Sequence, residues 1–209
     1  MKHQRPALTR LSIAVTTAVV LSVVLGGCFG TQNVKRYFQL GSPSPETVPR
    51  DGVLRLLVEP VKTNHLYDDF RIVYRLSPYQ VNYYSYDFWI GKPAELVQHF
   101  LVDYFRRCGH FERADDELLR QDPDLVLRSE LRVFEEIDEK SSWYARLSMG
   151  FELLDYRSGA VVLKYEFDRR RSLPERDVRH LPGAISKMLE QELNRFLQRI
   201  REKSETDDG

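Results

Sequence analysis

Few residues of this 209-residue chain combine the types and spacing that reaction chemistry requires. Cys108 and His110 lie two positions apart, and His65 precedes Asp68 and Asp69, so both groups carry side chains that can bind a metal ion. Each group lacks a fourth ligand at a recognisable spacing, and a cysteine that ends an apolar segment is more often a small buried residue. We therefore predict no metal site.

Motifs for catalysis give the same result. The sequence contains no Gly-x-Ser-x-Gly nucleophile elbow, no glycine-rich phosphate loop and no His-Glu-x-x-His pair. Acidic residues are plentiful, but most fall on the polar positions of segments that alternate as strands do. We predict no catalytic residue and no enzyme activity, and we keep a periplasmic enzyme only as the third hypothesis.

Cys28 is the remaining candidate for chemistry, and its position in the chain defines that chemistry. Lys2, Arg5 and Arg10 are followed by an uncharged apolar run over residues 11–25. This run is short for a membrane span but has the length of the apolar part of a secretory signal. The sequence therefore predicts an exported protein. The alternatives are an ordinary signal peptide with an incidental cysteine and an uncleaved signal anchor.

The tetrapeptide at residues 25–28, Leu-Gly-Gly-Cys, resembles the lipobox of bacterial lipoproteins. That resemblance implies a signal peptide over residues 1–27, cleavage before Cys28, an S-diacylglycerol on its thiol and an N-acyl group on its new amino terminus. No other cofactor is expected. Three acyl chains bind a membrane far more tightly than one. Phe29 stands where inner-membrane lipoproteins typically carry Asp, which implies sorting to the periplasmic face of the outer membrane.

Composition excludes several other classes of protein. The sequence has 31 basic and 31 acidic residues, and the signal removes three of the basic ones, so the mature chain is slightly acidic and no nucleic-acid binding is expected. Cys108 is the one cysteine left after acylation of Cys28, so no intramolecular disulfide can form. The mature length fits one domain with one core, which we place at residues 37–203 behind a tether at 28–36.

Hydrophobic periodicity predicts strands in both halves of this domain. In the first half they are expected at residues 37–40, 53–61, 70–76 and 81–86, and the last two would form a hairpin through the four residues 77–80. In the second half, Phe111 is expected in a short strand. Alternation of apolar and polar residues then predicts strands that begin at Leu125, Trp143 and Val161, the last two paired as a long antiparallel hairpin.

Two amphipathic helices are also expected. The first begins at Pro93, continues with apolar residues three and four apart and ends before Gly109. The second covers residues 183–203, with an apolar stripe that Glu192 interrupts. The predicted fold class is therefore α+β, a single domain in which an antiparallel sheet carries both helices on one face. Residues 204–209 are polar and are expected to be disordered.

Aromatic residues crowd the segment from Tyr79 to Trp89. Strand alternation directs Tyr83 and Trp89 to one face and Tyr84, Tyr86 and Phe88 to the other, so we predict that the latter set contacts a partner. The alternative is that these rings pack across strands in the core. A second candidate surface is the basic segment from Arg169 to Arg179, which we interpret first as a solvated loop and otherwise as a contact for anionic lipid or an acidic protein.

Several short motifs, in their order behind the lipobox, resemble the auxiliary lipoproteins of ABC-type transport systems, the PqiC-like family. They lie at residues 37–40, 71–75, 81–84, 87–89, 93, 109–111 and 153–155. The resemblance implies a membrane-integrity lipoprotein that works with an inner-membrane ABC transporter and an MCE-type periplasmic protein in lipid transport between two membranes. It also implies a homo-oligomer and brings no catalytic residue.

The leading hypothesis is a non-enzymatic outer-membrane lipoprotein that docks the periplasmic channel of such a transporter to the outer membrane. The alternative is a structural lipoprotein that assists assembly of an outer-membrane or secretion pore. Both share the anchor at Cys28 and the α+β fold, so neighbouring genes would distinguish them.

Overall fold

The long strands of the fold form where the sequence alternates between apolar and polar residues. The computed structural model describes residues 34–46, 53–118 and 121–207 of the chain. Residues Lys35–Gly209 form one compact unit. Its sheet strands, in chain order, are β1 (Arg36–Phe38), β2 (Arg55–Val58), β3 (Lys62–Thr63), β4 (Arg71–Ser77), β5 (Gln80–Trp89), β6 (Arg113–Asp115), β7 (Leu125–Glu139), β8 (Ser142–Asp155) and β9 (Val161–Leu173).

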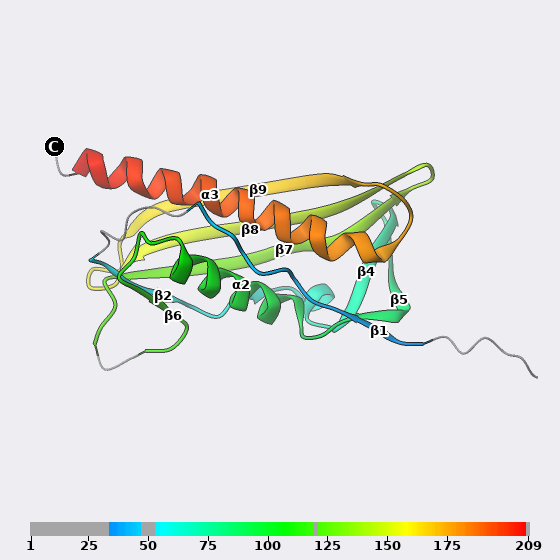
Figure 1. Ribbon diagram of the computed structural model, residues 1–209, viewed down its shortest axis with the longest axis horizontal. Helices are drawn as coiled ribbons and strands as arrows, with labels where there is room; N and C mark the ends of the chain where they lie inside the picture. Colours follow the sequence, from blue (N-terminus) through cyan, green and yellow to red (C-terminus); the bar gives the residue numbers. More distant parts are fainter. Residues whose placement is uncertain (1–33, 47–52, 119–120, 208–209) are drawn as a thin grey trace, which may run out of the picture. The chain divides into compact units, whose positions relative to one another are not determined.

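Strand β7 organises the sheet, because it pairs with β8 along its whole length and with three shorter strands on its other edge (Figure 1). The β7–β8 and β8–β9 pairs are antiparallel, as predicted, and their alternation places Leu147, Met149 and Phe151 in the core. The opposite face carries ion pairs between strands, such as Arg146 with Asp168 and Lys164 with Glu152. One face of the three long strands β7, β8 and β9 is therefore covered, and the other face carries residues that meet solvent.

The other half of the sheet corrects the expectation of an antiparallel sheet. Strands β2, β3 and β4 all run parallel to β7, and β1 and β6 run parallel to β5 and β2. Within this half, β4 and β5 form the predicted antiparallel hairpin. Parallel neighbours arise because the chain returns to the sheet through the helix and loops between strands, which local alternation does not reveal. The α+β class and the single-domain organisation are confirmed.

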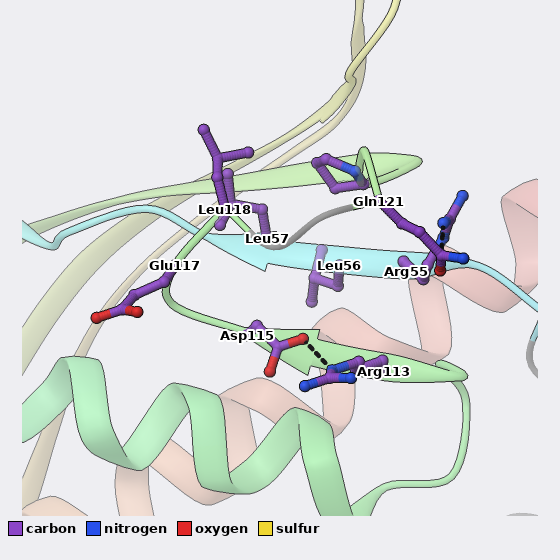
Figure 2. A pocket seen from close by; sticks show the side chains of 9 residues that line it. Arg55, Leu56, Leu57, Arg113, Asp115, Glu117, Leu118 and Gln121 are labelled. Atoms are coloured by element: carbon purple, nitrogen blue, oxygen red, sulfur yellow. Dashed lines mark hydrogen bonds and ion pairs between the residues drawn. The ribbon is translucent and has the colours of Figure 1, made fainter.

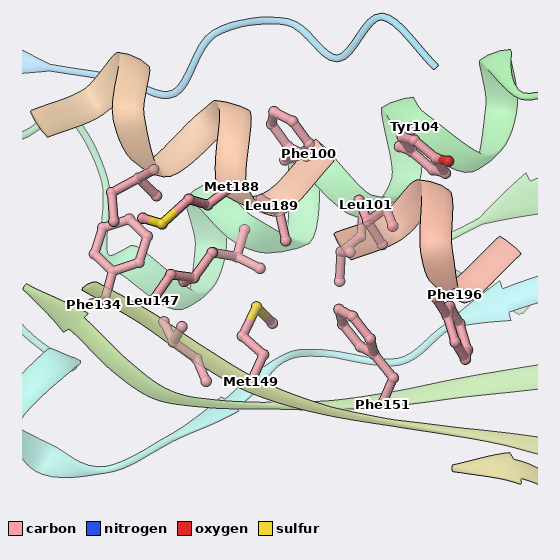
Figure 3. Close-up of a cluster of buried hydrophobic side chains, with 14 of the residues drawn as sticks. Phe100, Leu101, Tyr104, Phe134, Leu147, Met149, Phe151, Met188, Leu189 and Phe196 are labelled. Carbon is pink, nitrogen blue, oxygen red and sulfur yellow. The ribbon is translucent and has the colours of Figure 1, made fainter. Parts of the chain in front are cut away.

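Two helices cover one face of the sheet, α2 (Pro93–Arg107) and α3 (Leu181–Asp207). Figure 3 shows side chains of both helices meeting those of the long strands in one apolar cluster. Phe196 of α3 lies 5.3 Å from Phe151 of β8 between ring centroids. The Tyr104 hydroxyl of α2 donates to Asn194 of α3 at 2.6 Å. Among the described residues, neither helix combines the length and apolar composition needed to cross a membrane.

The ends of α2 follow from local chemistry. Pro93 occupies the first turn, where its missing N–H costs nothing, and the Glu95 side chain accepts a hydrogen bond from the Lys92 N–H at 3.1 Å. After Arg107, Gly109 adopts a φ of 78°, a left-handed conformation that favours glycine and ends the helix. Both boundaries agree with the sequence prediction.

Three local predictions are wrong. The turn between β4 and β5 spans two residues, because Ser77 and Gln80 already pair across the strands. Phe111 is buried against Phe105 rather than in a strand, and β6 begins at Arg113. The last helix was predicted to end at Lys203, but α3 continues through Asp207; residues 208–209 of the predicted disordered tail lie outside the described residues.

Two short 3-10 helices complete the fold. The first, η1 (His65–Tyr67), places Tyr67 in the core, and the second, η2 (Val178–His180), leads into α3. The signal at residues 1–27 and most of the tether at 28–36 lie outside the described residues, so these two predictions remain untested.

Candidate docking surface

The aromatic segment lies on β5, where the pairing with β4 is irregular. Arg71 of β4 pairs with Phe88, yet Val73 pairs with Tyr83, so β5 contributes three extra residues over this stretch. Such a bulge bends the strand and sharpens its twist. The far end of β5 thereby turns to pair with β1, where Tyr37 aligns with Phe88.

Tyr84 is half-buried, and its hydroxyl is fixed by the sheet. The Tyr84 Oη atom donates to Glu136 Oε1 of β7 at 3.0 Å, and its ring lies 4.8 Å from that of Tyr74. Burial and the adjacent Glu136 carboxylate raise the pKa of Tyr84 well above its usual value, so the phenol remains a donor. This side chain is a structural member of the surface as well as a candidate contact.

Glu136 forms the base of this region. It is 1% exposed, and its Oε2 atom has no hydrogen-bond partner among the described residues. Burial raises the pKa of Glu136, since the charged form loses its hydration. Asp138, two residues along β7, is also buried and pairs with Arg176 at 2.5 Å. The carboxylates of this part of β7 thus lie inside the fold, whereas the alternation of the sequence predicted that acidic residues of the strands face solvent.

A groove of about 500 Å³ lies between β5 and the segment that follows β9. Tyr83, Tyr84 and Tyr86 line it from β5, and Arg176 lines it from the other side. Asp87 closes it next to β1, where Arg36 binds it through two nitrogen atoms at 2.5 and 3.0 Å. The groove therefore presents tyrosine rings between charged groups that are already paired.

The three predicted contact residues do not form one continuous surface. Tyr86 is 45% exposed and lines the same groove as Tyr84. Phe88 is half-buried, stacks on Tyr37 with ring centroids 5.7 Å apart, and lines a neighbouring hollow. The alternation prediction placed the three on one side, and the bend of β5 separates them. Their role in partner contact stays a prediction.

The basic segment from Arg169 to Arg179 is not a solvated loop, because its first arginines belong to β9. Most of its arginines are paired with acids within the fold, whereas Arg171 donates to the neutral Gln191 side chain at 2.7 Å. Arg169 bonds to Glu192 and Arg170 to Glu139, and Arg179 pairs with Asp177. Arg179 lowers the pKa of Asp177 to about 2, so this pair is charged at neutral pH. The segment therefore offers mostly compensated charge, a weak basis for attracting an anionic partner.

The candidate metal ligands are used for other contacts. Cys108 is fully buried, its Sγ lies 3.4 Å from the Phe105 carbonyl oxygen, and burial raises the pKa of its thiol. Asp68 pairs with Lys92, and Asp69 with Arg71. Within the described part of the chain, no group of three or more potential ligands is close enough to bind a metal ion. Cys28 lies outside that part.

A further hollow of about 400 Å³, which the sequence did not indicate, lies beside β2 and β6 (Figure 2). Leu57 and Leu118 contribute apolar side chains to it. Two hydrogen bonds join polar residues of the lining, since Arg113 donates to Asp115 at 2.5 Å and Arg55 donates to Gln121 at 3.1 Å. Among the described residues that line the hollow there is no cysteine, serine or histidine.

Comparison with known proteins adds independent information. Residues 38–196 match the model of a protein family described as the ABC-type transport auxiliary lipoprotein component. A comparison with curated protein sequences found no match. The crystal structure of protein XCC0632 from Xanthomonas campestris, assigned to family DUF330, resembles the present fold with a TM-score of 0.68. It is 19% identical, and the match covers 81% of this chain and 99% of that one.

A second crystal structure, of an uncharacterized protein, has a TM-score of 0.65 and 16% identity, with 80% of this chain and 99% of the other covered. At these identities the two structures establish the fold and nothing about ligands or partners. Both of those structures are matched along nearly their full lengths.

Proposed function

The chain belongs to the ABC-type transport auxiliary lipoprotein family, and we propose that it is a non-enzymatic outer-membrane lipoprotein that docks a transporter's periplasmic channel to the outer membrane. The transporter would be an ABC system with an MCE-type periplasmic protein that moves lipid between the two membranes. The observation that carries the proposal is the family match over residues 38–196, which spans most of the described fold.

The proposed mechanism is positional. Acylated Cys28 holds one end of the chain in the lipid, and the nine residues from Cys28 to Tyr37 reach at most about 30 Å when fully extended. The domain must therefore stay close to the membrane that holds the anchor. A domain fixed at this height can receive the end of a periplasmic channel, and the groove with Tyr84 and Tyr86 is the candidate contact.

Self-association would extend the same role. We propose that several copies assemble around the channel, because a ring of copies offers one contact per subunit and gains avidity from weak individual contacts. Sedimentation of the acylated chain in detergent tests this part. A monomer at concentrations well above those in the membrane would contradict it.

The anchor is tested by membrane fractionation of two variants. Cys28→Ala should abolish incorporation of labelled palmitate and remove the protein from the outer membrane. Phe29→Asp is the matched control, because it keeps the thiol and should keep the palmitate but retain the protein at the inner membrane. If Cys28→Ala stays in the outer membrane as firmly as the parent, the proposed anchoring is wrong.

A further inference from the structure

Exposed apolar side chains gather beside the first strand. Tyr37 is 62% exposed, Ile90 61% and Phe70 48%, and Phe88 stacks on Tyr37. Together with Asp69, Arg71 and Trp89 these residues line a hollow of about 480 Å³. We call Tyr37, Phe70, Phe88 and Ile90 the Tyr37 patch.

The backbone holds this patch in place. Strand β1 is at the edge of the sheet and pairs with β5 (Figure 1). The Ile90 N–H donates to the Phe38 carbonyl at 2.8 Å, and the Trp89 N–H donates to the Phe70 carbonyl at 2.6 Å. Three segments that are distant in sequence therefore present these side chains together. Apolar surface in contact with water is unfavourable, so a surface that covers these side chains gains free energy.

Cationic side chains surround the patch. The Lys35 Nζ atom lies 5.6 Å from the centre of the Phe88 ring, and the Arg71 guanidinium lies 4.0 Å from that of Tyr83. Lys92 follows Ile90 by two residues. The nearby acids, Asp68 and Asp69, are paired with Lys92 and Arg71. Because those two cations are already compensated by acids, the aromatic and aliphatic side chains are what match the interface of a bilayer, where rings lie among the headgroups.

The length of the preceding chain identifies the occupant. The patch includes Tyr37, which lies nine positions after Cys28, a reach of at most about 30 Å. We propose that the Tyr37 patch rests on the lipid surface that holds the acylated Cys28. This inference rests on the proposed acylation. It assigns Phe88 to the membrane, and it leaves the groove with Tyr84 and Tyr86 free for a protein partner.

The tether makes such a small patch effective. Four side chains bind a bilayer weakly by themselves, but a short tether keeps their local concentration high, so the contact forms without a large intrinsic affinity. The contact would fix the orientation of the domain on the membrane. A docking subunit requires a fixed orientation, because the partner surface must face away from the lipid.

The test uses the acylated full-length chain in vesicles of phosphatidylethanolamine and phosphatidylglycerol. Nitroxide labels are placed at Tyr37→Cys and, as the matched control, at Tyr79→Cys, since Tyr79 is 98% exposed in the β4–β5 turn. Acylation blocks Cys28, and Cys108 is fully buried. We expect the label at position 37 to be more accessible to oxygen than to a water-soluble nickel complex, and the label at position 79 to show the reverse.

The outcomes separate this proposal from the proposed anchor. If the chain does not acquire acyl groups and does not join the vesicles, the anchor fails. If it is acylated and bound but the label at position 37 is as accessible to nickel as that at position 79, the membrane contact is overturned and the anchor stands. A label at position 37 that neither reagent reaches would mean that a second copy covers the patch, which also overturns the proposal.

A second variant pair provides an independent measurement. In Tyr37→Ser/Ile90→Ser, the exposed side chains are removed with little expected effect on folding, and a label at Lys35→Cys reports the orientation. We expect this label to lose its preference for oxygen in the double variant and to keep it in Tyr79→Ser. An unchanged preference in the double variant would contradict a role for the patch.

Discussion

Glu192 is an acidic residue on the apolar stripe of α3, and its removal should strongly destabilise the domain. It is 1% exposed and accepts hydrogen bonds from the Tyr165 hydroxyl at 2.6 Å and from Arg169 Nε at 2.8 Å. Arg195 of the same helix also contacts it. The carboxylate thus joins α3 to β9 through a charged network at the edge of the core.

The expected magnitude follows from what each partner loses. In Glu192→Ala, the hydroxyl of Tyr165, a residue that is 6% exposed, loses its acceptor, which costs about 1–3 kcal/mol. The Arg169 side chain is 47% exposed, so water can take over part of its solvation. We therefore expect a loss near the lower end of the range for breaking a buried ion pair, about 3 kcal/mol. Glu192→Gln keeps an acceptor and should lose about 1 kcal/mol.

The assay is urea unfolding of the chain that begins at residue 29, followed by circular dichroism. Tyr165→Phe completes a double-mutant cycle with Glu192→Ala. Because the hydroxyl and the carboxylate bond to each other, the cost of Glu192→Ala should be about 1 kcal/mol smaller in the Tyr165→Phe background. Unchanged midpoints for both Glu192 variants, or strictly additive losses, would refute the reasoning.

The same network predicts that the stability of the fold depends on pH in the alkaline range. Burial, and to a lesser extent the hydrogen bond to Glu192, raises the pKa of Tyr165 from 10.0 to about 12. Between these two values the unfolded chain has lost the phenolic proton and the folded chain retains it. Stability should therefore fall as the pH rises from 10 to 12. Tyr165→Phe should flatten this dependence, and a slope unchanged by that variant would contradict the assignment.

Four further variants test the core and the groove. Phe196→Ala should cost about 3–5 kcal/mol in urea unfolding, because the ring is fully buried and packs on Phe151. Glu136→Gln should raise the unfolding midpoint at neutral pH. Because the pKa of Glu136 is raised in the folded state, the stability of the parent should fall as the pH rises above 4.5. In Glu136→Gln this decrease should be smaller. An unchanged dependence of stability on pH would exclude a buried charge at this position. Tyr84→Phe should cost about 1 kcal/mol by losing its bond to Glu136. Tyr86→Ala should stay within about 0.5 kcal/mol of the parent and weaken capture of the proposed periplasmic partner, whereas a larger stability loss would assign the Tyr86 ring to the core.

The elements that could be predicted are those with a local signal. Helix α2 carries apolar residues three and four apart between Pro93 and Gly109, and β8 alternates from Trp143 onward. The parallel neighbours of β7 could not be predicted, because pairing between distant segments depends on how loops return to the sheet. The bulge in β5 likewise depends on its partners β4 and β1, not on its own sequence.

The candidate functional residues also divide into those that a local motif indicates and those that only the fold brings together. A local motif indicates Cys28, whereas the Tyr37 patch combines residues from three segments and has no signature within any of them. Glu135 and Glu136 are the clearest failure, since adjacent acids in a strand suggest at least one solvent face. Both are buried because each face of β7 is covered here, with Tyr67 bonding to Glu135 and Tyr84 to Glu136.

The most direct test of the central claim is purification of the full-length chain from membranes in mild detergent, with the associated proteins identified by mass spectrometry. A Cys28→Ala preparation serves as the control. The proposed function predicts enrichment of an ABC permease, its ATPase and an MCE-type protein with the parent chain and their loss from the control. Enrichment of an outer-membrane barrel or a secretin, with none of the transporter subunits, would contradict it and favour the pore-assembly alternative.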